Sequence, residues 1–174
     1  GIIIIGWFIL NDHMQFTWYF LAAISMFLLG AIDDYWSISW RIKLPTQILT
    51  GFLVWVQFIQ EMPLITFFGY SISDNPIIVG PLFVFWFVGI VNAVNLIDGM
   101  DGLAGGYIFL TSFFALIIGW ITGNKDFIYF NTIFMGAMAA FLYFNQRPAK
   151  FFMGDSGSLL LGFHLAVLPL LYFA

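Results

Sequence analysis

Residues 82–91 read Leu-Phe-Val-Phe-Trp-Phe-Val-Gly-Ile-Val and contain no polar side chain. A second stretch, from Ile108 to Ile121, is interrupted only by Thr111 and Ser112. The strands of a transmembrane barrel would instead alternate apolar and polar residues over about ten positions. Backbone groups in lipid must be paired within the protein, and a long helix pairs them within each span. These stretches therefore predict an all-α fold, a polytopic transmembrane helical bundle.

The composition of the whole chain agrees with a membrane protein in a lipid bilayer. The 174 residues are 62% hydrophobic and only 8% charged, and the mean hydropathy is +0.99. So little polar surface cannot cover a water-soluble globule. The formal net charge is −4 and there is no basic run, which argues against a nucleic-acid partner. With no Cys and only two His, any metal would be held mainly by oxygen.

Polar residues divide the chain into spans. A span takes about 20 apolar residues, because a helix rises about 1.5 Å per residue across about 30 Å of hydrocarbon. We expect about six full spans and one partial span, in a single integral membrane domain over residues 1–174 that is a fragment of a longer protein. The turn-forming residues between 61 and 76 predict a short hairpin. The partial span is expected at 1–10, and the full spans at 16–32, 44–60, 77–95, 103–122, 127–145 and 157–174.

The order of the spans places connections 33–43, 96–102 and 146–156 on one face of the membrane. Only one basic residue, Lys125, falls on the other face. By the positive-inside rule, the face rich in basic residues is cytoplasmic. Its basic residues are Arg41, Lys43, Arg147 and Lys150, and its acids are Asp33, Asp34, Asp98, Asp101 and Asp155.

Asp33 and Asp34 directly follow an apolar stretch that ends at Ile32. Two adjacent acids can simply end a helix and face water. They also repel each other unless a cation lies between them or one stays protonated. The pair therefore suits holding magnesium or removing a proton. For these two residues alone, this functional interpretation and the simple helix end stay equally open.

The stretch from Asn92 to Gly106 carries a polar residue at every third position, at Asn92, Asn95, Asp98 and Asp101. If it is helical, Asn95, Asp98 and Asp101 lie on neighbouring parts of one face. A glycine-rich loop between two helices would explain the glycines but not an Asn/Asp stripe that enters the membrane. The spacing matches neither a dinucleotide fingerprint nor a P-loop. The pattern favours a functional site.

Residues 152–158, Phe-Met-Gly-Asp-Ser-Gly-Ser, open the last span. The free N–H groups of a helix N-terminus favour an anion, such as a phosphate or a metal-bound diphosphate. An intramembrane serine protease is a rival interpretation of Gly-x-Ser-Gly, but its nucleophile needs a His base within hydrogen-bond reach. His164 lies eight residues beyond Ser156 on the same helix and His13 on the opposite face, so no base is expected. We expect His164 to be a packed helix residue.

Three segments together resemble the signature loops of the polyprenyl-phosphate N-acetylhexosamine-1-phosphate transferases, glycosyltransferase family 4. They are Gly30 to Tyr35, Asn92 to Gly106 and Phe152 to Ser158. The resemblance implies transfer of a sugar 1-phosphate from a UDP-N-acetylhexosamine to undecaprenyl phosphate, with release of UMP. It implies magnesium, or manganese in its place, a homodimer, and loops on the cytoplasmic face of the bacterial inner membrane. Family members carry further spans before the first segment and a later His-rich loop.

The resemblance also implies roles for individual residues. Asp155 would be the main magnesium ligand, with Asp33, Asp34 and Asp98 near the metal, and one of the paired acids would deprotonate the lipid phosphate. Asp33, Asp34 and Asp98 are thus the candidate catalytic acids. Phe152 would stack on uracil. The other candidate substrate-binding residues are Asn95, Asp101 and Lys43 by resemblance, and Arg147 and Lys150 by their charge.

The sugar and two other protein classes stay open. The segments look more similar to the GlcNAc-1-phosphate branch, with the phospho-MurNAc-pentapeptide transferases as the alternative. An ion-coupled transporter would also use intramembrane Asp and Asn, but its site lies near the membrane midplane between inverted repeats. Here the acids gather at one face and no repeat is visible. A lipid-binding or scaffold role is the third alternative.

Overall fold

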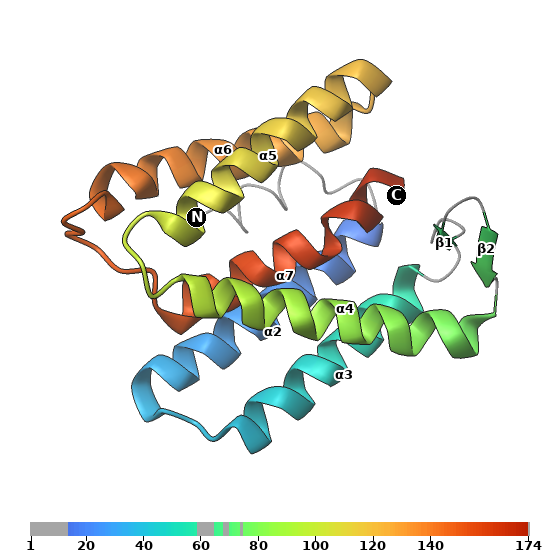
Figure 1. Ribbon diagram of the computed structural model, residues 1–174, viewed down its shortest axis with the longest axis horizontal. Helices are drawn as coiled ribbons and strands as arrows, with labels where there is room; N and C mark the ends of the chain where they lie inside the picture. The colour runs from blue at the N-terminus through green and yellow to red at the C-terminus, as the bar shows by residue number, and fades with distance from the viewer. Residues whose placement is uncertain (1–13, 59–64, 68–69, 74, 174) are drawn as a thin grey trace.

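The computed structural model describes residues 14–58, 65–67, 70–73 and 75–173. In that part of the chain, six helices and two short strands follow one another (Figure 1). The helices are α2 (Met14–Trp36), α3 (Trp40–Phe58), α4 (Pro76–Ile97), α5 (Leu103–Thr122), α6 (Lys125–Asn145) and α7 (Gly154–Phe173). The strands β1 (Ile65–Phe67) and β2 (Tyr70–Ser73) pair antiparallel, so the predicted hairpin is confirmed.

The described helices confirm the predicted polytopic bundle. Among the described residues, five helices are long and apolar enough to cross a membrane, namely α2, α4, α5, α6 and α7. The predicted span 44–60 is not one of them. Helix α3 begins at Trp40, so it includes Arg41 and Lys43, and these charges lower its hydropathy. The predicted partial span at 1–10 lies outside the described residues.

Local sequence explains where several helices begin. Asn75 caps α4, since its side chain accepts the Ile77 N–H at 3.0 Å, and Pro76 follows at the first helical position, where no N–H is needed. Between α5 and α6, Asn124 accepts the Phe127 N–H at 3.0 Å in the same way. These two caps define the first residues of α4 and α6.

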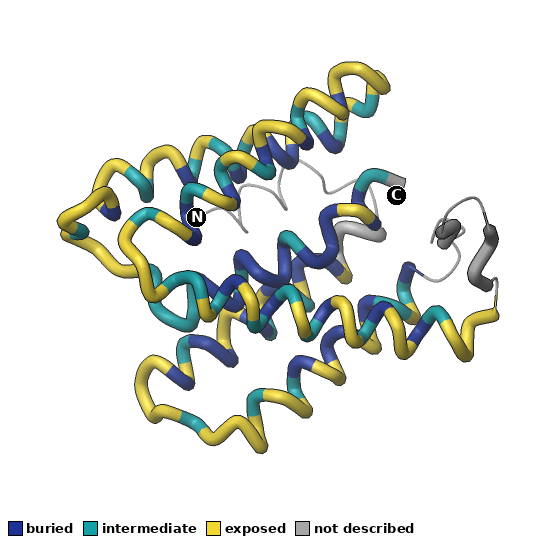
Figure 2. The backbone as a smooth tube through the Cα atoms, viewed as in Figure 1, coloured by how far each residue is buried: buried dark blue, intermediate teal, exposed yellow. Residues whose placement is uncertain are grey.

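Helix α7 lies at the centre of the bundle. It packs most extensively against α2 and α4, and Figure 2 shows it as largely buried, whereas α5 and α6 pair mainly with each other. A Cβ on Gly162 would lie 2.8 Å from the Val91 Cα of α4, and one on Gly30 of α2 would collide with the Asp155 backbone. In lipid, such close backbone contacts are a main source of helix association.

His164 is packed inside this core, as expected. It is 1% exposed, and its Nδ1 shares a 3.2 Å hydrogen bond with the Tyr19 hydroxyl. Its ring stacks on Phe134 with centroids 3.6 Å apart. His164 is therefore engaged elsewhere and does not serve as a base for Ser156.

Connections 33–43, 96–102 and 146–156 lie at one end of the bundle, on the left in Figure 1. Hydrogen bonds join them: Asp34 binds the backbone of Asp155, and Asp101 binds the backbone of Ala149. The predicted gathering of these three connections is confirmed. The fold thus brings acids and cations that lie far apart in sequence to the same end.

Candidate active site

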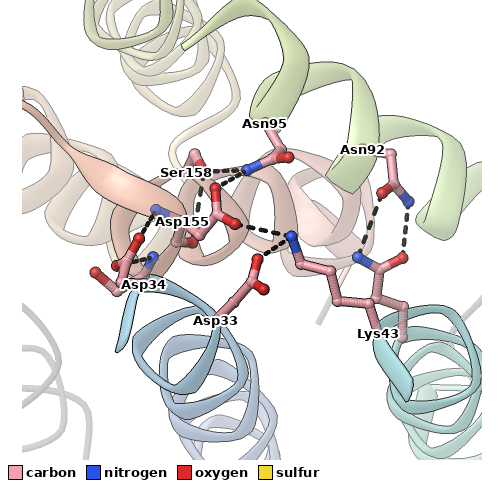
Figure 3. A network of polar contacts seen from close by, with 9 residues as sticks. Asp33, Asp34, Lys43, Asn92, Asn95, Asp155 and Ser158 are labelled. Carbon is pink, nitrogen blue, oxygen red and sulfur yellow. Dashed lines mark hydrogen bonds and ion pairs between the residues drawn. The ribbon is translucent and has the colours of Figure 1, made fainter. Parts of the chain in front are cut away.

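Lys43 lies between two carboxylates that come from different helices (Figure 3). Its Nζ forms an ion pair with Asp33 at the end of α2 and another with Asp155 at the start of α7, whose Oδ2 is 2.8 Å away. Asp33 is buried, while Lys43 and Asp155 are half-buried. Three of the residues singled out from the sequence therefore meet in one cluster at the end of the bundle.

Asn95 of α4 fixes the other side of the Asp155 carboxylate. Its Nδ2 donates a 2.7 Å hydrogen bond to Asp155 Oδ1 and another of 2.7 Å to Ser158 Oγ. Both oxygens of Asp155 thus have a donor, Lys43 on one and Asn95 on the other. This arrangement sets the direction in which the carboxylate faces.

Asp34 has a different environment from its neighbour Asp33. Its two oxygens accept the backbone N–H groups of Asp155 at 2.7 Å and Ser156 at 3.0 Å. Gly154 precedes them with φ of 68°, a conformation that favours glycine, and a Cβ there would lie 2.9 Å from Asp34 Oδ2. An anion at the N-terminus of the last helix was expected, and in the structure the Asp34 carboxylate itself takes that place.

Asp98 and Asp101 follow the end of α4 and differ from each other. Asp98 is the C-cap residue, so the predicted helical stripe reaches it, but Asp101 lies in the next turn. Burial, together with the negative charges of Asp155 and Asp34, raises the pKa of Asp98 to about 6. Asp101 is exposed and accepts the Ala149 N–H at 3.1 Å. The expectation that Asn95, Asp98 and Asp101 share one helical face is therefore wrong for Asp101.

Three buried or half-buried amides in this region received no role from the sequence. Asn145 is 5% exposed, accepts the Gly102 N–H at 2.8 Å and donates to the Phe151 carbonyl at 2.6 Å. Gln47 and Asn92 bind each other across α3 and α4. Asn92 belongs to the polar pattern found in the sequence, whereas the signal for Gln47 and Asn145 was only an amide side chain inside an apolar stretch near the charged end.

The remaining candidates lie on the connection between α6 and α7. Arg147 and Lys150 are exposed, and among the described residues neither forms an ion pair. Phe152 is 75% exposed. These side chains are open to a ligand from solution, whereas Asp33, Asn95 and Asp155 form the fixed part of the site.

The carboxylate oxygens of Asp33 and Asp155, which both contact Lys43, fit a divalent cation of the magnesium type. In the described ranges, no group of three or more His, Cys, Asp and Glu side chains is arranged to hold a metal ion. Asp33 and Asp155 nevertheless converge on one positive charge. Proteins commonly bind Mg²⁺ through one or two carboxylates, with waters and substrate phosphates as the other ligands. The donor set suits an ion shared with an anionic substrate.

Comparison with known proteins identifies relatives of this chain. It is similar to the phospho-N-acetylmuramoyl-pentapeptide-transferase of Streptococcus pneumoniae serotype 2, with 34% identity over 82% of this chain and 46% of the relative. It is also similar to the probable undecaprenyl-phosphate N-acetylglucosaminyl 1-phosphate transferase of Bacillus subtilis, with 33% identity over 87% and 42%. A third relative is the undecaprenyl-phosphate alpha-N-acetylglucosaminyl 1-phosphate transferase of Thermotoga maritima, with 37% identity over 89% and 45%.

The chain spans about half the length of these curated relatives. The sequence model of glycosyl transferase family 4 matches residues 16–173, which include all three connections of the charged end. Since the match covers nearly the whole described structure, the chain belongs to glycosyl transferase family 4.

Proposed function

We propose that the full-length protein transfers a sugar 1-phosphate from UDP-GlcNAc to undecaprenyl phosphate, at the cytoplasmic face of a bacterial inner membrane. The observation that carries the proposal is the convergence of Lys43, Asp33 and Asp155 from three helices, α3, α2 and α7, at one end of a membrane-type bundle. Such a place is reached both by a soluble nucleotide and by the head group of a lipid. The names of the relatives point to the same class of reaction.

The proposed reaction exchanges one phosphoanhydride bond for another. An oxygen of the lipid phosphate bonds to the phosphorus that bears the sugar, and the bond from that phosphorus to the UMP oxygen breaks. Both substrates are anionic, so acids alone would repel them. Asp33 and Asp155 would hold magnesium or manganese beside the Lys43 ammonium, and the metal would neutralise the diphosphate. Lys43, Arg147 and Lys150 add positive charge from the protein itself.

The three candidate catalytic acids receive different roles in this proposal. Asp33 shares the cation position with Asp155, and Asp34 caps α7. Among the described residues, no donor binds the Asp98 carboxylate, and its pKa of about 6 keeps it mostly ionised near neutral pH. Asp98 is therefore assigned to accept the proton of the lipid phosphate, because a base works best with a pKa near the operating pH.

The substrate-binding residues follow from their positions. Phe152, exposed at the end of the connection between α6 and α7, offers a ring for uracil to stack on. Asn95 orients Asp155. Asp101 holds the connection that carries Lys150, since it binds the backbone at Ala149. The product, an undecaprenyl diphosphate sugar, suits the first membrane step of a cell-envelope polysaccharide such as lipopolysaccharide or teichoic acid.

The proposal also specifies the sugar nucleotide that donates the sugar 1-phosphate. UDP-GlcNAc is favoured by the segments around Asp98 and Asp155, and two of the three relatives above are named for N-acetylglucosaminyl transfer. The third is named for phospho-N-acetylmuramoyl-pentapeptide transfer. UDP-MurNAc-pentapeptide is therefore the competing donor that an experiment must include.

UMP release by the purified full-length protein in detergent tests the proposal. Undecaprenyl phosphate is supplied with either UDP-GlcNAc or UDP-MurNAc-pentapeptide, each with magnesium and with EDTA. We expect metal-dependent release with UDP-GlcNAc alone. Release only with the pentapeptide donor would correct the sugar, and no release with either donor from folded protein would contradict the transferase itself.

A further inference from the structure

A pair of amide side chains joins α3 to α4 beside the proposed site. Gln47 is 1% exposed, and its Oε1 accepts a 2.7 Å hydrogen bond from Asn92 Nδ2. Gln47 Nε2 donates back to Asn92 Oδ1 over 3.5 Å. Asn92 Nδ2 also donates to the Val88 carbonyl at 2.8 Å, within its own helix. The two amides thus use their hydrogen-bonding capacity on each other and on the backbone, inside the protein.

This amide pair and the contacts of Asp155 link three helices into a closed ring, in which one turn of α3 and one turn of α4 supply the remaining connections (Figure 3). Lys43 and Gln47 lie one turn apart on α3, and Asn92 and Asn95 lie one turn apart on α4. Lys43 and Asn95 each bind one oxygen of Asp155, at 2.8 Å and 2.7 Å. Starting at Asp155 of α7, the ring runs through α3 and then α4 and returns to Asp155.

Helix α3 is the least apolar of the described helices and is held in the bundle by two neighbours. Among the described helices, it alone falls short of a candidate span, and it packs against α2 and α4. In lipid, helices associate through close packing and interhelical hydrogen bonds rather than through the hydrophobic effect. The amide pair therefore fixes the rotation and height of α3, and with them the point from which Lys43 extends.

We propose that Gln47 is a positioning residue that, paired with Asn92, keeps the Lys43 ammonium between Asp33 and Asp155. This inference rests on the proposed transferase function. Gln47 lies a turn deeper in the bundle than Lys43 and acts through it. Negative charge develops in the transition state, so a displaced Lys43 ammonium stabilises the transition state less well. The same displacement weakens the substrate complex by a smaller amount. A defect at Gln47 therefore lowers kcat more than it raises KM.

Steady-state kinetics of the full-length protein with Gln47→Leu test this role. We expect kcat to fall by about 10- to 100-fold, with the KM for the UDP-sugar within about threefold of wild type. Gln57→Leu makes the same chemical change ten residues further along α3, so its kcat should match wild type. A purely structural role for Gln47 would lower the unfolding temperature or the yield and leave kcat of the folded protein unchanged.

Exchanging the two side chains adds a rescue test. Gln47→Asn leaves two short amides, and Asn92→Gln leaves two long ones, so each single variant mismatches the gap. The double variant restores the summed length, and we expect its kcat to exceed that of both singles by about tenfold. If Gln47→Leu does not fold, these three variants decide the question.

Two results overturn the positioning role while leaving the transferase intact. They are an active wild type whose kcat is unaffected by Gln47→Leu or Gln47→Asn, and a double variant no better than the worse single. A wild type that releases no UMP with any donor is a different result, because it contradicts the proposed function on which the inference rests.

Discussion

The carboxylate of Asp34 accepts the backbone N–H of Asp155 at 2.7 Å, so an acid near the end of α2 caps a helix whose first turn contains another acid. Its second oxygen accepts the Ser156 N–H at 3.0 Å. The adjacent Asp33 faces Lys43 instead. Two neighbouring acids therefore have separate tasks, one at a cation and one at a helix terminus.

If Asp34 caps α7, replacing it should destabilise the fold. Asp34→Ala removes both acceptors, and we expect a loss of about 1 kcal/mol in unfolding free energy, the usual effect of deleting an N-cap. Asp34→Asn keeps one acceptor oxygen and should fall between Ala and wild type. Thermal unfolding of the full-length protein in detergent with EDTA measures both. Unchanged unfolding together with lost turnover would place Asp34 in the chemistry rather than at the cap.

The raised pKa of Asp98 makes stability depend on pH. The folded protein holds the Asp98 proton more tightly than the unfolded chain, whose pKa is near 3.8. This contribution to stability is fully present below the unfolded pKa and is lost as pH rises through about 6. Asn cannot ionise, so in EDTA the unfolding temperature of Asp98→Asn relative to wild type should rise between about pH 4 and about pH 7.5. If the unfolding temperatures of the two proteins change in parallel with pH, the raised pKa of Asp98 is refuted.

Gly30 tests the close contact between α2 and α7. A Cβ at this position would collide with the backbone of Asp155, so Gly30→Ala must push the two helices apart. We expect a loss of about 1–3 kcal/mol in stability and a large loss of turnover. Gly136→Ala is the matched control, because nothing lies within 4 Å of its Cβ position, and it should be neutral or slightly stabilising. Equal behaviour of the two variants would argue against this packing.

Asn145 should hold two of the connections together. It accepts the Gly102 N–H and donates to the Phe151 carbonyl, so Asn145→Leu leaves both backbone groups without their partner. The expected loss is about 1–3 kcal/mol, with faster proteolysis at residues 146–153. Asn145→Asp keeps the acceptor for Gly102 and should be less damaging in a limited-proteolysis assay. Wild-type cleavage rates in Asn145→Leu would show that the connection is held by other contacts.

The sequence was sufficient to predict the parts of the site that follow from span order. Apolar stretches of helical length locate the ends of α4 and α6, and an alternating topology brings Asp33, Asp98 and Asp155 to one end. The predicted end of α2 at residue 32 is wrong, because this helix continues through Asp33 and Asp34 to Trp36. The hydropathy of α3 was overestimated, because its first residues, with Arg41 and Lys43, were assigned to the preceding connection. A periodic pattern indicates where a helix lies better than where it begins.

Side-chain partners that depend on helix rotation could not be predicted. Asp34 reaches the α7 backbone and Asp33 does not, which only the packing of α2 on α7 decides. Gln47 and Asn92 are 45 residues apart, and no local pattern pairs them. Asp101 leaves the helical stripe because the chain turns after Ile97 and Gly102 adopts φ of 74°.

Asp155→Asn tests the central claim, that the charged end of the bundle is one metal-dependent phosphotransfer site. Asparagine has the same shape as aspartate, and its side-chain oxygen can still accept the hydrogen bond from Asn95. The change removes the negative charge that is proposed to bind magnesium. In the full-length protein, UMP release across a magnesium titration should fall by at least about 100-fold, with little change in the unfolding temperature. Wild-type turnover with unchanged magnesium dependence in Asp155→Asn would contradict the account.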